Sequence, residues 1–173
     1  FLLLLLILFN GVLAMSEIAI VSSRKSRLQK LADDGSPGAE TALALANEPS
    51  GFLSTIQVGI TTVGILSGAI GENALATPLA AWLSEFSFLA PHARALSLIV
   101  VVVLLTYFSV VVGELVPKRL GLLAPEKIAS LIAAPMNWMA RMTRPLVWLL
   151  STSSSVVLQL VGAKSREEPP VTN

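Results

Sequence analysis

One glutamate, Glu114, directly follows a long apolar stretch of the chain. Residues 95–113 are nineteen consecutive uncharged residues, rich in valine and leucine. If this stretch is a helix in lipid, a carboxylate at its end is costly unless it lies at the interface, joins an ion pair or binds a cation. Glu114 is therefore the first residue to consider for chemistry.

Pro117 changes the backbone next to this carboxylate. Proline has no N–H, and its ring pushes away the carbonyl four residues earlier, which belongs to Gly113. A freed carbonyl beside a carboxylate offers the oxygen ligands that Mg²⁺, Ca²⁺ or Na⁺ prefer. The alternative is a helix end at which Glu114 pairs with Lys118, four residues later. Tyr107, seven residues before Glu114, is predicted to share its face, either hydrogen-bonded to it or as an interfacial aromatic residue.

A stripe of small and hydroxyl-bearing residues runs along a second apolar stretch, residues 52–71. Its members fall on one helix face and are Thr61, Gly64, Ser67, Gly68 and Gly71. Gly64 and Gly68 form a G-x-x-x-G pattern, which is typical of close packing between membrane helices. A second interpretation is that Ser67, Thr61 or glycine carbonyls also offer oxygens to an ion.

The first apolar stretch, residues 1–21, contains Asn10, Ser16 and Glu17. Asn10 and Glu17 are seven residues apart, which places them on one helix face and Ser16 on another. The stretch has no basic segment before it and is followed by Arg24, which favours a spanning helix over a signal peptide. It starts without an initiator methionine, so we expect the chain to be part of a longer protein.

The composition indicates that these residues lie in a membrane domain. Of the 173 residues, 54% are hydrophobic and only 13% are charged, whereas soluble domains carry about a quarter charged residues. A net charge of +1 excludes a strongly basic nucleic-acid-binding protein. The chain has no cysteine and one histidine, His92, so thiolate and histidine-rich metal sites are excluded. With no nucleophile–base pair or cofactor motif visible, the sequence predicts no enzyme.

Basic residues predict how the chain crosses the membrane. They cluster after the first apolar stretch, after the third and near the end, at Arg24, Lys25, Arg27, Lys30, Lys118, Arg119, Lys127, Lys164 and Arg166. The segment after the second stretch has only Arg94 and His92. By the positive-inside rule, the N-terminus is outside and the C-terminus is cytoplasmic in a cell membrane. Residues 128–161 are then expected to lie along the inner interface or return against the bundle; the alternative is a fourth crossing.

The predicted fold is an all-α integral membrane protein with three transmembrane helices per subunit and cytoplasmic juxtamembrane helices. The transmembrane helices are assigned to residues 1–22, 50–73 and 94–117. The remaining segments are a cytoplasmic helical hairpin (23–49), an extracytoplasmic segment (74–93), juxtamembrane or interfacial helices (118–163) and a linker to a cytosolic domain (164–173).

Three motifs together resemble the transmembrane domain of the CorC/CNNM family of magnesium transporters. They are Ala14-Met15-Ser16-Glu17-Ile18-Ala19, Phe52-Leu53-Ser54-Thr55-Ile56-Gln57-Val58-Gly59-Ile60-Thr61 and Gly113-Glu114-Leu115-Val116-Pro117-Lys118. Their order and spacing match that family, and they cover nearly the whole chain. The resemblance implies Mg²⁺ transport through an oxygen-ligand site among the three helices, with Mg²⁺ as the transported ion.

The same resemblance implies partners and ligands. It predicts a homodimer in membrane lipid and a cytosolic pair of nucleotide-binding CBS domains in the full-length protein. Carried over by motif, the predicted metal ligands are Ser16, Ser67 with nearby backbone oxygens, Gly113 and Glu114. Two other functions remain open: a Mg²⁺-sensing regulator of other transporters, and a dimerising membrane anchor for the cytosolic domain.

Overall fold

The computed structural model describes residues 1–160, and every regular element among them is a helix. The predicted linker at residues 164–173 lies outside the described residues. The elements are α1 (Leu2–Ser22), α2 (Lys25–Asp33), α3 (Ala39–Asn47), α4 (Pro49–Gly71), the π turn η1 (Glu72–Ala76), α5 (Thr77–Ser84), the short turn η2 (Ala90–His92), α6 (Ala93–Val110), the π turn η3 (Val111–Leu115), α7 (Val116–Leu123) and α8 (Pro125–Leu160).

Three helical stretches are long and apolar enough to cross a membrane, which confirms the predicted fold class. They are Leu2–Ser22, Pro49–Ser84 and Ala90–Leu123, with mean hydropathies of 2.3, 1.5 and 2.8 in their most apolar windows. The second stretch joins α4, η1 and α5, and the third joins η2, α6, η3 and α7. Helix α8 is not among the three stretches.

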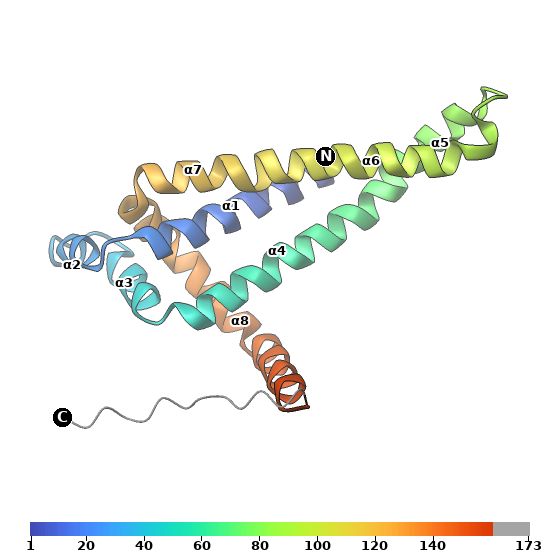
Figure 1. Ribbon diagram of the computed structural model, residues 1–173. Helices are drawn as coiled ribbons and strands as arrows, with labels where there is room; N and C mark the ends of the chain where they lie inside the picture. Colours follow the sequence, from blue (N-terminus) through green and yellow to red (C-terminus); the bar gives the residue numbers. More distant parts are fainter. Residues whose placement is uncertain (161–173) are drawn as a thin grey trace.

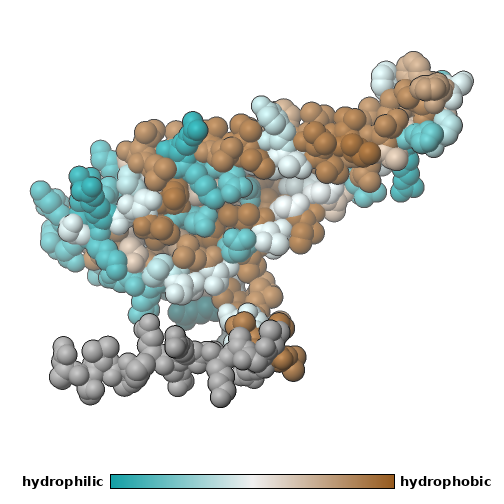
Figure 2. All heavy atoms as spheres, in the orientation of Figure 1, coloured by the Kyte–Doolittle hydropathy of each residue, from teal (hydrophilic) through white to brown (hydrophobic). Residues whose placement is uncertain are grey.

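The spans diverge from a packed end of the molecule (Figure 1). Helix α1 lies along α7 and η3, while α4 runs away from it to meet α6 at the end that carries α5. At the other end, α2, α3 and the start of α8 close over the bundle. Figure 2 shows apolar atoms along most of the spans and hydrophilic atoms at the α2 end, with a further hydrophilic patch over α1 and α7.

The main hydrophobic core lies where α8 crosses the packed end. Its fully buried members come from five helices and include Leu13, Ile20, Leu28, Ala42, Ile56 and Ala129. Helix α8 contributes Ala133 and Met136 to this core along its first half. The core therefore fixes the C-terminal half of α1 and the N-terminal half of α4.

Two π turns carry the second and third spans past prolines. In η1 the Thr77 N–H bonds to the carbonyl of Glu72, and in η3 the Val116 N–H bonds to that of Val111. Each of these bonds reaches back five residues, and each is followed at once by a proline. The wider turn gives the proline ring room against the carbonyl four residues earlier. The helices therefore continue beyond the expected ends of the spans, to Ser84 and Leu123.

Gly38 lets the α2–α3 turn pack against α8, so Gly38→Ala is expected to destabilise the domain. Gly38 has a φ of 80°, and a Cβ there would collide with the Ser130 carbonyl oxygen. Gly35 is the matched control, because its φ is 76° but a Cβ there would meet nothing within 4 Å. Both alanines bear the left-handed strain of roughly 1–2 kcal/mol, and Gly38→Ala adds the clash. Thermal unfolding in detergent should rank Gly38→Ala below Gly35→Ala; equal loss would show that the turn does not contact α8.

Candidate functional site

The η3 turn presents one backbone carbonyl to helix α1. Because Pro117 has no N–H, the Gly113 carbonyl lacks its ordinary helical donor, as the sequence predicted. The structure supplies a donor from another helix: the Asn10 side chain donates from Nδ2 to this oxygen over 3.0 Å. The sequence did not predict this bond, although Asn10 and Glu17 were placed on one face of the first helix.

Glycines bring α1 and the third span into backbone contact at this level. A Cβ at Gly113 would lie 3.2 Å from the Ile7 carbonyl oxygen, and one at Gly11 would lie 2.9 Å from Cγ of Pro117. Further along, a Cβ at Gly121 would lie 3.0 Å from the Met15 carbonyl oxygen. This close approach is what lets a short asparagine side chain on one helix reach the backbone of the other.

One turn further along, Lys118 bridges two carboxylates from different helices. Its Nζ lies 2.8 Å from Oε1 of Glu114 and 3.6 Å from Oε2 of Glu17. The side chains of Glu17, Lys118 and Glu114 are 31%, 33% and 42% exposed, respectively. The alternative pairing of Glu114 with Lys118 is therefore present in the structure. Glu17, the second acidic group, was not predicted as part of it.

The other two predicted ligands, Ser16 and Ser67, have different partners. Ser16 is fully buried on α1, and its hydroxyl donates to the Val12 carbonyl oxygen over 2.6 Å. Ser67 is 5% exposed and lines a cleft between α4 and α6. The other polar residues of that cleft are Glu72, Thr106 and Ser109. The structure thus brings Gly113 and Glu114 together with Asn10, Glu17 and Lys118, whereas Ser16 and Ser67 have other neighbours.

Tyr107 does not contact Glu114. Its side chain is 61% exposed, and its ring makes an edge-to-face contact with Phe108. The seven-residue spacing assumed an unbroken α-helix, and the π turn between the two residues inserts one extra residue. That residue rotates everything after it by about 100°.

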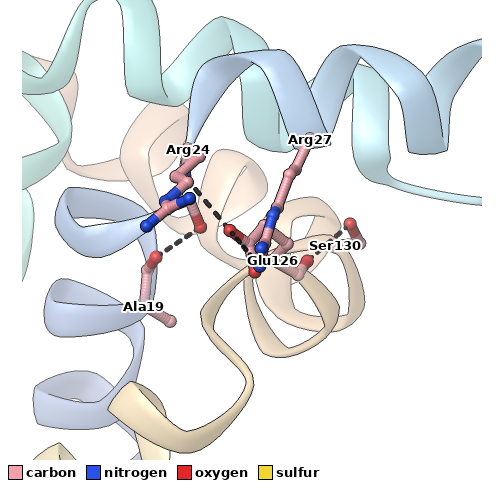
Figure 3. A network of polar contacts seen from close by, with 6 residues as sticks. Ala19, Arg24, Arg27, Glu126 and Ser130 are labelled. Atoms are coloured by element: carbon pink, nitrogen blue, oxygen red, sulfur yellow. Dashed lines mark hydrogen bonds and ion pairs between the residues drawn. The ribbon is translucent and has the colours of Figure 1, made fainter.

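A second polar network, shown in Figure 3, lies at the C-terminal end of α1. Glu126 at the start of α8 is 11% exposed at its side chain and accepts from the backbone N–H of Arg24 over 3.3 Å. Its carboxylate also lies 3.9 Å from the Arg27 guanidinium. Helix α2 has no side-chain cap of its own, so Glu126 caps it from another helix. This carboxylate ties α8 to the junction that follows α1.

Comparison with known proteins identifies the family. The family described as "Cyclin M transmembrane N-terminal domain" (CNNM) matches residues 1–173. The chain belongs to the CNNM family. The predicted resemblance is therefore confirmed, and the family is one of membrane domains and transporters rather than enzymes.

Relatives of this CNNM domain are found in several bacteria. It is 48% identical over 172 residues to a UPF0053 protein of Synechocystis, covering 99% of this chain and 38% of that protein. It is 33% identical over 171 residues to a polyamine export protein of Haemophilus influenzae, covering 97% of this chain and 39% of that protein. It is 31% identical to a polyamine export protein of Escherichia coli over 155 residues, covering 90% of this chain and 34% of that protein. The chain thus spans about two fifths of the first two relatives.

The donor set available here is mostly neutral. Within residues 1–160, no three histidine, cysteine, aspartate or glutamate side chains are grouped so that they could hold a metal ion. A cation at η3 would therefore draw on one or two carboxylates, backbone carbonyls, amide or hydroxyl oxygens and water. This set suits hard cations and not soft ones.

Proposed function

We propose that this domain binds Mg²⁺ at the Gly113–Glu114 turn and carries it across the membrane. The observation that supports the proposal is the set of hydrogen bonds at this turn. Two of the four predicted ligands, the Gly113 carbonyl and the Glu114 carboxylate, are held by donors from the domain itself, Asn10 and Lys118. A cation could replace those two donors and bind the same oxygens of Gly113 and Glu114.

The charge at the turn suits an ion that must be released again. Mg²⁺ needs six oxygens in near-octahedral geometry and gives up water reluctantly, so it usually keeps several waters beside one or two carboxylates. Glu114 and Glu17 can supply at most two negative charges, and Lys118 stays close enough to compete for both. Transport requires binding that is weak enough to let the ion leave.

A polyamine is the second candidate cargo, and one observation favours it. Lys118 already places an ammonium group between Glu114 and Glu17, and a polyamine carries ammonium groups of the same kind. Two of the relatives described above are named polyamine export proteins. A Mg²⁺-sensing regulator and a dimerising membrane anchor are further alternatives, and both differ from a transporter in producing no flux.

Competition between the two cargoes tests the assignment. Mg²⁺ titrated calorimetrically into the purified full-length protein should bind, and a tenfold excess of spermidine should leave that binding nearly unchanged. Spermidine binding that Mg²⁺ displaces only weakly would instead identify a polyamine carrier. The Synechocystis and Haemophilus relatives measured in parallel would show whether the preference differs within the family.

We further propose that Mg²⁺ transport takes place in a homodimer. Gly64 and Gly68 on α4 have open space within 4 Å of a Cβ position, so the G-x-x-x-G face is free to pack against a second copy. In the full-length protein, a cytosolic CBS pair would follow α8. Light scattering in detergent should give a dimer, and a monomer that still binds Mg²⁺ would remove the dimer from the mechanism.

The proposed orientation places α2 and α3 in the cytoplasm and the α5 end outside. Because the chain has no native cysteine, single cysteines report their side of the membrane cleanly. In intact cells, a cysteine at Ser87, which is exposed beyond α5, should react with an impermeant thiol reagent, and one at Ser36, between α2 and α3, should react only after lysis. The reverse pattern would invert the topology.

A further inference from the structure

One buried oxygen at the site has no hydrogen-bond partner. Within residues 1–160, Oδ1 of Asn10 is the one side-chain nitrogen or oxygen atom that is fully buried and lacks a partner. Buried amide oxygens are nearly always satisfied, because leaving one without a donor costs free energy. Of the two ends of this amide, only Nδ2 is therefore held by a hydrogen bond.

The hydrogen bond to Gly113 fixes the orientation of this amide. Nδ2 donates to the Gly113 carbonyl over 3.0 Å. With the amide turned over, Oδ1 would face that carbonyl, and two acceptors would lie against each other. Because Pro117 cannot give the carbonyl the usual helical N–H donor, the turn uses the amide nitrogen and leaves Oδ1 without a partner.

The geometry is suited to a metal ion after the amide rotates. If the amide turns over, Oδ1 takes the place of Nδ2, about 3.0 Å from the Gly113 oxygen. Adjacent ligands of an octahedral Mg²⁺ at about 2.1 Å from the ion are separated by about 3.0 Å. The two oxygens would therefore match one edge of the octahedron without any shift of the helices.

We propose that Asn10 is a switching ligand of the Mg²⁺ site. Without the ion, Nδ2 holds the Gly113 carbonyl; with the ion, the amide turns over, and Oδ1 and the Gly113 oxygen bind Mg²⁺ together. This inference rests on the proposed function and adds a ligand to the same site. The other end of the amide makes no hydrogen bond that would hold it in place, so the turn breaks only the bond to Gly113.

Two substitutions separate a ligand from a structural donor. Asn10→Leu removes both polar atoms and keeps a similar volume, whereas Asn10→Asp keeps an oxygen at the ligand position and adds a negative charge. In calorimetric titrations of the full-length protein with Mg²⁺, Asn10→Leu should bind about tenfold to a hundredfold more weakly than wild type, because a charge-assisted contact is lost. Asn10→Asp should bind at least as tightly as wild type.

Asn73 provides the matched control. It lies in the other π turn, and its Nδ2 donates to the Ala69 carbonyl on the same helix, so Asn73→Leu should leave affinity unchanged. If Asn10 is only a structural donor, Asn10→Asp will not outperform Asn10→Leu, and that result would overturn the inference. If Asn10→Leu does not fold, an Asn10→Asp protein that binds more weakly than wild type overturns it equally.

Failure of the proposed function gives a different result. A wild-type protein with no Mg²⁺ binding overturns the proposed cargo, and the switching ligand with it. Wild-type binding that Glu114→Gln weakens and Asn10→Leu leaves intact overturns the switching ligand alone.

Discussion

Replacing Glu114 by glutamine is expected to weaken Mg²⁺ binding by roughly thirty-fold to several thousand-fold. The substitution keeps the shape of the side chain and deletes its charge. Removing one partner of a desolvated charge pair costs about 2–5 kcal/mol, and about 1.4 kcal/mol corresponds to tenfold in affinity. Because the Glu114 side chain is 42% exposed, screening by solvent places the effect towards the lower end of this range. Calorimetric titration of the purified full-length protein measures the difference directly, and Glu114→Ala should bind no better.

Glu85→Gln is the control for this prediction. Glu85 is an exposed glutamate that follows α5 at the other end of the second span, so its substitution should leave Mg²⁺ affinity unchanged. If Glu114 served only as the helical partner of Lys118, the pair would be worth a few tenths of a kcal/mol. Glu114→Gln would then change binding by less than about threefold, and the site assignment would be wrong.

Replacing Lys118 by methionine is expected to strengthen Mg²⁺ binding by about tenfold or more. Its ammonium lies 2.8 Å from Glu114 and 3.6 Å from Glu17, so an incoming cation must displace it. A unit charge at about 4 Å contributes roughly 4 kcal/mol at an effective dielectric constant of 20. Part of that energy is lost to screening at these half-exposed side chains. Methionine keeps the length of the side chain and removes this competitor.

Arg119→Met tests whether the effect belongs to the bridge or to net charge. Arg119 is the adjacent basic residue and is exposed, so its loss changes the charge of the domain equally without freeing Glu17 or Glu114. We expect it to leave affinity nearly unchanged. Equal tightening by both substitutions, or weaker binding by Lys118→Met, would show that the ammonium does not compete with the ion.

The three spans were predictable from the sequence, whereas their ends were not. Long uncharged runs indicate lipid-facing helices regardless of tertiary contacts, and all three were found. Pro117 was expected to end the third span, but the helix continues to Leu123 through the π turn. A helix that is apolar on all faces shows no periodic pattern in its sequence. The extra residue of a π turn therefore leaves no mark in that pattern, and the turn could not be predicted. The same π turn, in which Glu114 lies, changes the helical spacing from Tyr107 that the sequence analysis assumed.

The sequence predicted those features of the site that depend on one helix alone. The freed Gly113 carbonyl follows from the proline alone, and the Glu114–Lys118 pair follows from helical spacing. The bond from Asn10 and the contact from Glu17 depend on the close approach of two helices, which the pattern of one helix does not encode. The shared face of Asn10 and Glu17 was the available signal, because both residues contact the third span. The assignments of Ser16 and Ser67 remain predictions.

Magnesium flux in liposomes shows whether the protein carries Mg²⁺ across the membrane and whether Glu114 is needed for it. The full-length wild-type protein and Glu114→Gln would be reconstituted at equal density, and entry of Mg²⁺ would be followed with a trapped fluorescent indicator. We expect Mg²⁺ flux through the wild-type protein, and we expect Glu114→Gln to reduce it to the level of empty liposomes. Equal flux through both proteins, or none through a wild-type protein that binds Mg²⁺, would contradict transport through this site.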